Sequence, residues 1–362
     1  MWLNKRLRNK FLKVFLITLA GGLILVGAFV LGWRIIVRPP EVPEHAEQPF
    51  IPDRTETTPP QEEPDRPAFD MAEGHPSDEK IGEDLDPEPE GWVRRDDFFT
   101  LLLFGYDDGI NTDTIIVAAF DVGNREAFLI NIPRDTEVDV SRNIRRINSA
   151  YPVGRQGGRG HAGGVDQLRR ELQTIIGFIP DFYVGVDENA FIRIIDAVGG
   201  VNIRVPFHMY YRDPTQDLTI NLPAGMQRLN GNQAMQFVQY RLGSDYSPTI
   251  SDHRRMQHGQ MVIQAVLDEL LSPRIILQVP ELIGTYRAFV DTDLTLINKL
   301  YFAEQFLLGD VTIHTYIYPT TSLLDRFWYE VPIQDEAIAL INRTINPFTQ
   351  DLTEENFQFF QR

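Results

Sequence analysis

Three short stretches of the chain concentrate the residue types that handle phosphate chemistry. The first runs from Gly105 to Thr114 and carries a carboxylate near each end, Asp107 and Asp113, between two apolar segments. Carboxylates at the edge of a sheet are the oxygen ligands that Mg²⁺ prefers, and Mg²⁺ bound to one or two of them completes its shell with water and phosphate. Acidic hairpin turns are also common without any metal, so the spacing alone leaves both interpretations open.

The second stretch is rich in arginine. Arg134 directly follows an apolar segment, and Arg145 and Arg146 come a short loop later. Guanidinium groups clustered in this way could hold phosphate oxygens through paired hydrogen bonds. The alternative is that Arg134 pairs on the surface with a nearby carboxylate, Asp135 or Asp139.

The third stretch joins Gln239-Tyr240-Arg241, through a loop, to a predicted helix that opens at Asp252. Arg255 falls in the first turn of that helix, where free backbone N–H groups and the helix dipole favour a phosphate dianion. Asp252 is also in the right place to cap the helix N-terminus. The histidines of this helix have no spacing partner that would make a zinc site.

The elements that must position these residues indicate a layered α/β fold. Runs of apolar and β-branched residues predict strands at 98–104, 114–120, 127–132, 182–186 and 201–205. Helical spacing predicts helices at 164–176, 189–198, 230–240 and 255–271, and Gly199-Gly200 closes the second of them. The mixture predicts one α/β/α layered domain with a mixed central sheet over residues 92–350, followed by a C-terminal tail at 351–362.

The N-terminal segment predicts a membrane anchor. The predicted transmembrane helix covers 14–36, and its core, 14–33, has no charged residue and rises roughly 30 Å as a helix, the thickness of the hydrocarbon core. Five basic residues lie in 1–13 against two in 34–38, so the N-terminus is expected in the cytoplasm and the large domain outside the cell membrane. A cleaved signal peptide is the alternative, but its apolar part would be shorter and would end in small residues.

The composition changes sharply after this helix. Residues 39–90 contain twelve prolines, seventeen Asp or Glu and three Lys or Arg, which predicts an acidic, Pro-rich, disordered tether at 39–91. The chain carries a net charge of −17, so nucleic acid is not an expected partner and any anion site must be a local basic pocket. There is no cysteine, which excludes thiol catalysis and cysteine-ligated zinc.

Taken together, the ordered motifs resemble the LytR-CpsA-Psr family. Their order and spacing agree across nearly the whole predicted domain, so the set is far more specific than any one member. The motifs are Leu101–Asp107, Thr112–Thr114, Ile132–Thr136, Arg146–Tyr151, Ile195–Val201, Leu222–Gly225 and Leu229–Ala234.

The resemblance implies a membrane-anchored phosphotransferase of cell-wall assembly. Such an enzyme moves a glycopolymer from a polyprenyl pyrophosphate carrier to peptidoglycan, releases polyprenyl phosphate, and lines a slot for the prenyl chain with apolar residues. By this similarity Asp107 and Asp113 hold Mg²⁺, and Asp252 orients an arginine or helps to activate the acceptor hydroxyl. The residues implied to bind the pyrophosphate are Arg134, Arg146, Arg241, Arg255 and Gln260.

The chain departs from the usual family pattern at the cationic end of this site. Family members usually carry an Arg-x-Arg pair where this chain has Gln239-Tyr240-Arg241, and an Arg-Gln-Gln run where it has His258-Gly259-Gln260. Arg145, Arg254 or a protonated His258 are the candidates to compensate. The departures leave two alternatives open: a catalytically weakened relative that binds lipid-linked glycopolymer or peptidoglycan, and a pyrophosphate hydrolase.

Overall fold

The computed structural model describes most of the chain after the predicted anchor. The described ranges are 37–52, 91–106, 112–215, 218–244, 246–270, 272, 289–307 and 311–362, without the side chains of residues 252, 253, 306 and 307. The predicted segments 1–13 and 14–36 and the candidate ligand Asp107 therefore lie outside the described residues. Within the described ranges, every helix is too short or too polar to span a bilayer.

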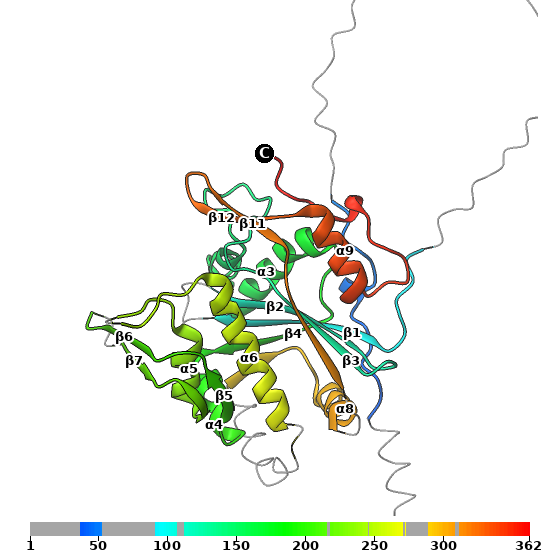
Figure 1. Cartoon of the computed structure of the whole chain (residues 1–362). Coiled ribbons are helices and arrows are strands. Elements are labelled where there is room, and N and C mark those ends of the chain that lie inside the picture. Colours follow the sequence, from blue (N-terminus) through cyan, green and yellow to red (C-terminus); the bar gives the residue numbers. More distant parts are fainter. Residues whose placement is uncertain are drawn as a thin grey trace, which may run out of the picture.

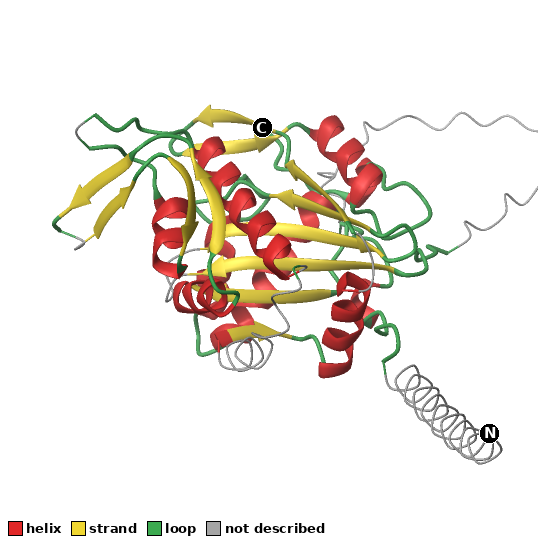
Figure 2. Ribbon diagram, turned by 60° about the horizontal axis from the view of Figure 1, so that its bottom comes forward, coloured by secondary structure: helices red, strands yellow, loops and turns green. Residues whose placement is uncertain are grey.

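A six-stranded mixed sheet forms the centre of the domain (Figure 2). Its order is β10-β3-β2-β1-β4-β9; β1 is antiparallel to β2 and parallel to β4, and β3 is parallel to β10. The mixed α/β fold predicted from the sequence is confirmed, and the first three strands are neighbours as their short connections required. The strand bounds are β1 Phe98–Tyr106, β2 Thr112–Asp121, β3 Glu126–Asn131, β4 Phe182–Asp187, β9 Val290–Thr292 and β10 Thr312–Ile317.

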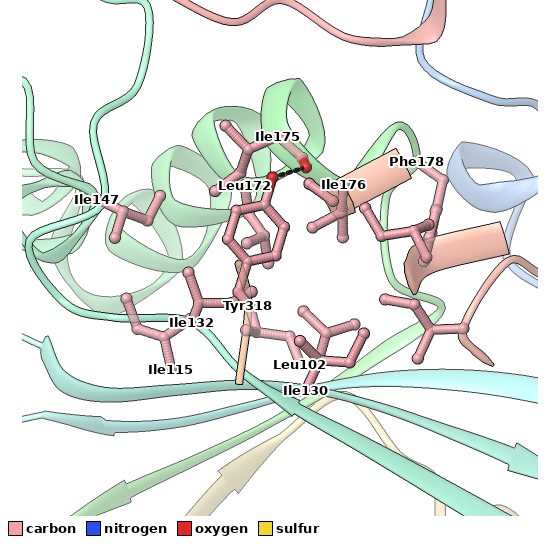
Figure 3. Packing of buried hydrophobic residues seen from close by; sticks show 14 of the residues in the cluster. Leu102, Ile115, Ile130, Ile132, Ile147, Leu172, Ile175, Ile176, Phe178 and Tyr318 are labelled. Carbon is pink, nitrogen blue, oxygen red and sulfur yellow. Dashed lines mark hydrogen bonds between the residues drawn. The ribbon is translucent and has the colours of Figure 1, made fainter. Parts of the chain in front are cut away.

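Helices cover both faces of this sheet because successive strand residues point to opposite sides. On one face, Leu102 packs in a core with Leu172 of α3 and Ile341 of α9. In this core the buried Tyr318 donates a hydrogen bond from its hydroxyl to the carbonyl of Ile175, 2.6 Å away (Figure 3). On the other face, strand residues pack against α8. The helix bounds are α2 Ala150–Arg155, α3 Gly160–Ile176, α8 Leu296–Leu307 and α9 Gln334–Thr344.

A second core lies beside the sheet, among three helices and two antiparallel strand pairs (Figure 1). Asp187 caps the first of these helices by accepting a hydrogen bond from the N–H of Ala190 at 2.6 Å, and Gly199-Gly200 ends it with φ of 80° and 91°. Asn230 and Gln233 form a capping box at the start of the second helix. The bounds are α4 Glu188–Ala197, β5 Val201–Val205, β6 Met209–Asp213, β7 Leu218–Leu222, β8 Gly225–Leu229, α5 Gly231–Gln239 and α6 Asp252–Leu270.

The C-terminal part of the chain completes the central core. Beyond β10 it forms an antiparallel hairpin of β11, Thr320–Leu324, and β12, Trp328–Pro332, before α9. The predicted tail 351–362 packs into the core, where Leu352, Phe357 and Phe359 are buried. Apolar residues at this spacing give the last segment a buried face, so it belongs to the folded domain.

The prediction of a disordered tether over 39–91 is wrong for its first part. Residues 39–52 pack on the domain: Ala46 is fully buried, and the N–H of Phe50 donates to the carbonyl of Gly177 at 2.7 Å. Arg94 donates to the carbonyl of Ala46 and Asn356 to that of Phe50. The composition misled because backbone groups, which every residue carries, provide most of these contacts. Residues 53–90 lie outside the described residues.

Candidate functional site

A cavity of about 370 Å³ lies between the sheet and helices α4, α5 and α6. Its walls are mostly apolar, which suits a hydrocarbon ligand. The strands contribute Leu103, Ile116, Val184 and Val186, α4 contributes Phe191, Ile194 and Ile195, α5 contributes Met235 and Val238, and α6 contributes Met256, Val262, Ile263, Val266 and Leu267.

Polar side chains enter the cavity from one edge of the sheet. The carboxyl ends of β1, β3 and β4 meet there with the start of β2, since Gly105 pairs with Thr114 on one side and Val186 on the other. A register shift between Gly105 and Tyr106 ends the regular pairing at this point. The polar residues that line the cavity include Asp113, Arg134, Asp187, Glu188, Gln239 and Arg255.

Asp113 and Arg134 form the centre of this polar end. The Arg134 guanidinium donates from Nη1 to Oδ1 of Asp113 at 2.8 Å, and both side chains line the cavity. The Arg134 side chain is 24% exposed and the Asp113 side chain 56% exposed, so the pair remains open to a ligand. The backbone carbonyl of Arg134 accepts a hydrogen bond from the N–H of Asn148, and the carbonyl of Asn148 accepts one from the hydroxyl of Thr112. These two bonds fix the loop that carries Arg134.

Arg255 reaches the same cavity from the first turn of α6. Met256, Gly259, Val262 and Ile263 follow it on the same face of the helix, so one face carries a cation at its start and apolar groups further along. Of the four residues expected to lie together beside an apolar space, Asp113, Arg134 and Arg255 line this cavity, and Asp107 lies outside the described residues. Such a cavity can hold a molecule with an anionic head and an apolar tail.

Arg146 lies behind this polar end rather than in its wall. Its Nε and Nη2 donate to the carbonyl of Trp328 at 2.9 and 2.6 Å, and its Nη1 is 3.2 Å from Oδ1 of Asp135. Asp135 in turn lies 4.0 Å from Nε of Arg134. In this geometry Arg146 stabilises the loop that presents Arg134.

Two further predicted anion-binding residues point elsewhere. Gln260 donates from Nε2 to the carbonyl of Tyr316 at 3.0 Å and so ties α6 to the end of β10. Arg241 is exposed at the end of α5 and is not part of the cavity wall. For Asp252, the structure shows that the backbone begins α6, and its side chain lies outside the described residues.

Of the three candidates to compensate for a missing cation, Arg145, Arg254 and a protonated His258, the histidine is excluded. His258 is 2% exposed and stacks on Phe237 at 4.4 Å between ring centroids, in the second core. Burial lowers the pKa of His258 to about 4, which leaves the imidazole neutral near pH 7. The next residue, Gly259, does face the cavity, and a Cβ built on it would meet nothing within 4 Å.

Two acidic residues of the polar end were missed at the sequence level. Asp187 and Glu188 line the cavity where β4 passes into α4, and Glu188 accepts a hydrogen bond from Nε2 of Gln239 at 2.8 Å. The sequence signal that could have found these two residues is an Asp-Glu pair at the end of a strand before a helix. The end of β4 lies beside the end of β1, where Tyr106 pairs with Asp187. Across the described residues, no cluster of three or more histidine or carboxylate groups is arranged to hold a metal ion.

Tyr106 borders the cavity at the end of β1. Its hydroxyl donates to Oδ2 of Asp291 at 2.6 Å, and burial together with this carboxylate raises the pKa of Tyr106 above its usual value. The phenol therefore stays protonated at neutral pH, and its ring forms a fixed part of the cavity wall. Tyr106 directly precedes Asp107 in the sequence.

Comparison with known proteins assigns the chain to a family. The sequence model described as the LytR_cpsA_psr family matches residues 66–344. The chain belongs to the LytR_cpsA_psr family. This match includes every one of the predicted site residues named above.

Characterised LytR_cpsA_psr proteins are similar in sequence. The regulatory protein MsrR of Staphylococcus aureus (strain COL) is 27% identical over 232 residues, which are 62% of this chain and 64% of that protein. The chain thus spans less than two thirds of the length of this relative. The polyisoprenyl-teichoic acid–peptidoglycan teichoic acid transferase TagU of Oceanobacillus iheyensis is 26% identical over 281 residues, 75% of this chain and 83% of that protein.

Solved structures show the same fold. The crystal structure of Bacillus subtilis TagV matches 69% of this chain and 97% of that chain with a TM-score of 0.56 at 22% identity. A structure of TagT bound to LIIa-WTA matches 70% of this chain and 95% of that chain with a TM-score of 0.55 at 19% identity. The mixed sheet with its flanking helices is therefore the fold of these proteins.

Proposed function

We propose that the chain is a membrane-anchored phosphotransferase that moves a glycopolymer from a polyprenyl pyrophosphate carrier to peptidoglycan. The observation that carries the proposal is the convergence of Asp113, Arg134 and Arg255 at one end of an apolar cavity. Relatives named as teichoic acid transferases support the class of reaction. The predicted helix 14–36 would hold the domain at the outer surface of the cell membrane, where such a carrier is found.

The charged and the apolar residues of the cavity match the two parts of this donor. The diphosphate would lie between the guanidinium groups of Arg134 and Arg255, and the first part of the prenyl chain would lie along Val262, Ile263 and Val266. Each buried CH₂ group adds about 0.8 kcal/mol of binding free energy. Asp187 and Glu188, in contrast, repel the diphosphate and so restrict it to the side of the arginines.

A divalent cation fits the donor set of this end. Mg²⁺ takes one or two protein carboxylates and completes its shell with phosphate oxygens and water, so the small number of described carboxylates does not argue against it. We propose that Asp113, together with Asp107, holds Mg²⁺ beside the diphosphate. The ion would supply neutralisation of charge on the phosphate oxygens.

The residues of the chain then serve to position and to neutralise. An acceptor hydroxyl oxygen attacks the phosphorus that carries the glycopolymer, the bond from that phosphorus to the bridging oxygen breaks, and polyprenyl phosphate leaves with the electron pair. Arg134 and Arg255 stabilise the charge that builds on the phosphate oxygens, which is the main requirement of phosphoryl transfer. Asp252 is proposed to accept the hydroxyl proton or to orient an arginine.

The direct test uses the full-length chain in lipid nanodiscs with Mg²⁺, a polyprenyl-pyrophosphate oligosaccharide and peptidoglycan fragments. We expect release of polyprenyl phosphate that depends on the acceptor, with the oligosaccharide phosphate found on the peptidoglycan. Arg134→Ala should slow this release by about 10²- to 10³-fold, whereas substitution of an exposed arginine on α9, Arg343→Ala, should leave it unchanged. Release without acceptor would instead show a hydrolase.

A catalytically weakened relative that binds without turnover is the second candidate. It is favoured because two positions where the family usually carries a cation or an amide are Gln239 and Gly259 here, and both line the cavity. Gln239 already donates to Glu188, and Gly259 offers no side chain. Saturable binding of the lipid donor with no release of polyprenyl phosphate in the same assay would establish this function and reject the transferase.

A further inference from the structure

A second hollow of about 370 Å³ lies beside the β11–β12 hairpin, apart from the lipid cavity. Its walls come from the loop 140–145, from the tip of the hairpin and from Phe360 near the C-terminus. Figure 1 shows the hairpin and the C-terminal end together at one end of the domain. We call this hollow the hairpin groove.

Three arginines line the hairpin groove in a chain that is strongly acidic overall. Arg142, Arg145 and Arg326 line it against one carboxylate, Asp325, although the chain carries −17. Arg142 and Arg145 are held from behind by the nearly buried Glu171 and Glu137. Arg326 is exposed and forms no ion pair with the described residues, so its charge is available at the rim.

Aromatic rings lie beside two of these guanidinium groups. Arg145 stacks on Phe360 with 3.9 Å from Cζ to the ring centroid, and Arg326 lies over Phe327 at 5.7 Å. Stacking holds a guanidinium flat and leaves donors at its edge; in Arg145, Nε and Nη2 already donate to Glu137, so Nη1 is the donor that can reach a ligand. Rings beside fixed polar donors also suit the apolar face and hydroxyl rim of a sugar.

The hairpin groove is linked to the polar end of the lipid cavity. The carbonyl of Trp328, in the same hairpin, accepts two hydrogen bonds from Arg146, and Asp135 connects Arg146 to Arg134. Through these contacts the hairpin supports the loop that carries Arg134. A polymer attached to a diphosphate in the cavity leaves the cavity at this end.

We propose that the hairpin groove binds an anionic glycan chain next to the site of transfer, an inference that rests on the proposed function. The chemistry recognised is a run of sugars that carries carboxylate or phosphate groups. Two chains have this chemistry: the glycopolymer of the donor and the peptidoglycan acceptor. Arg326 and Phe327 form the outer contact, and Arg145 with Phe360 forms the inner one.

The test measures binding of soluble glycans to the full-length chain in nanodiscs without any lipid donor. The probes are a glycerol phosphate polymer, glycan strands freed from peptidoglycan, and neutral dextran of similar length. We expect one or both anionic probes to bind, more weakly as salt rises, and dextran to bind at least about tenfold more weakly, as expected for lost charged hydrogen bonds. Preference for the phosphate polymer assigns the groove to the donor, and preference for the strands assigns it to the acceptor.

Variants make the test specific to the groove. Arg326→Ala combined with Phe327→Ala should weaken the anionic probe about tenfold or more, and Arg326→Lys should retain part of the affinity. The matched control is Arg343→Ala, because Arg343 is also exposed and lies over a ring, Tyr316, at 5.8 Å. Equal binding of dextran and both anionic probes, or equal loss in the control, overturns the proposal. Arg134→Ala leaves this binding intact, so failure of transfer and failure of the groove are distinguishable.

Discussion

Two arginine–aspartate pairs in this domain perform different tasks. Arg94 and Asp181 lie just before β1 and β4, at the end of the sheet opposite the site. Nη2 of Arg94 is 2.9 Å from Oδ2 of Asp181, and the side chains of Arg94 and Asp181 are 14% and 0% exposed. Both oxygens of Asp181 accept from Arg94, and one also accepts from the N–H of Thr100. Arg134 and Asp113 are joined at a similar distance, but both side chains remain accessible in a cavity wall.

The contrast separates an ion pair that holds the fold from one that can receive a ligand. Burial raises the pKa of Asp181 even though Arg94 and Thr100 act in the opposite direction, so desolvation is larger than the gain from pairing. Nothing further can bind to that carboxylate. The Asp113 side chain remains largely hydrated because it is 56% exposed. It can therefore bind a cation in place of Arg134, and Arg134 can then bind a phosphate.

The largest expected effect follows from breaking the buried pair. Asp181→Ala leaves Arg94 with an uncompensated charge beside the core and should lower the free energy of unfolding by about 3–5 kcal/mol. Asp113→Ala should lower it by less than about 1 kcal/mol, since that side chain is largely exposed. Urea denaturation of the two variants measures both values, and similar losses would show that the comparison is mistaken.

The second effect should appear in activity with little change in stability. Arg134→Ala removes a fixed cation from the developing phosphate charge and should slow transfer by about 10²- to 10³-fold. Arg134→Lys keeps the charge but not the fork of donors, so its rate should be intermediate. Initial rates of polyprenyl phosphate release test this order. A rate for Arg134→Ala equal to that of the unmodified chain would remove Arg134 from the site.

Two substitutions of Gly259, in the cavity wall, should separate an effect on stability from an effect on lipid binding. Gly259→Ala should raise the free energy of unfolding by up to about 1 kcal/mol, because a helical glycine is costly and its Cβ position is open. Gly259→Leu would fill the space beside Arg255 and should weaken binding of a polyprenyl phosphate severalfold. Gln257→Leu, on the exposed face of the same helix, is the control. Unchanged lipid affinity in Gly259→Leu would place the lipid elsewhere.

The last effect concerns pH. His258 has a pKa near 4 in the folded chain and about 6.5 when unfolded, so the unfolded state binds more protons between these values. Its contribution is fully present above pH 6.5 and is lost as pH falls towards 4, with a slope of at most about 1.4 kcal/mol per pH unit. His258→Phe should flatten stability between pH 4.5 and 6.5 relative to the unmodified chain. The exposed His45→Gln should not.

The sequence was most informative where local pattern decides structure. The strand Val201–Val205 was predicted at its exact bounds, and Gly199-Gly200 ends α4 as expected. Alternating apolar residues and helix-ending glycines act within a few positions, so they are visible in the sequence. The convergence of Asp113 and Arg134 also followed, since both lie at strand ends that a mixed sheet brings to one edge.

The misplaced residues depend on contacts with distant parts of the chain. Arg146 is held by the carbonyl of Trp328, 182 positions later, and Gln260 by the carbonyl of Tyr316. A backbone acceptor has no signature in the sequence, so the basic character of Arg146 suggested a ligand where a structural partner exists. His258 was misjudged for a related reason, because its burial, which lowers its pKa, results from tertiary packing.

The packing of residues 39–52 changes the meaning of the acidic stretch that follows. The N–H of Phe50 donates to the carbonyl of Gly177, and Arg94 donates to the carbonyl of Ala46, so the described residues on both sides of this stretch are attached to the domain. Because both ends of the acidic stretch are attached to the domain, its length does not set the distance between domain and membrane in the proposed topology, in which Val37, 6% exposed, directly follows the predicted membrane helix. The domain would be moored against the lipid surface, within immediate reach of a carrier that never leaves the bilayer.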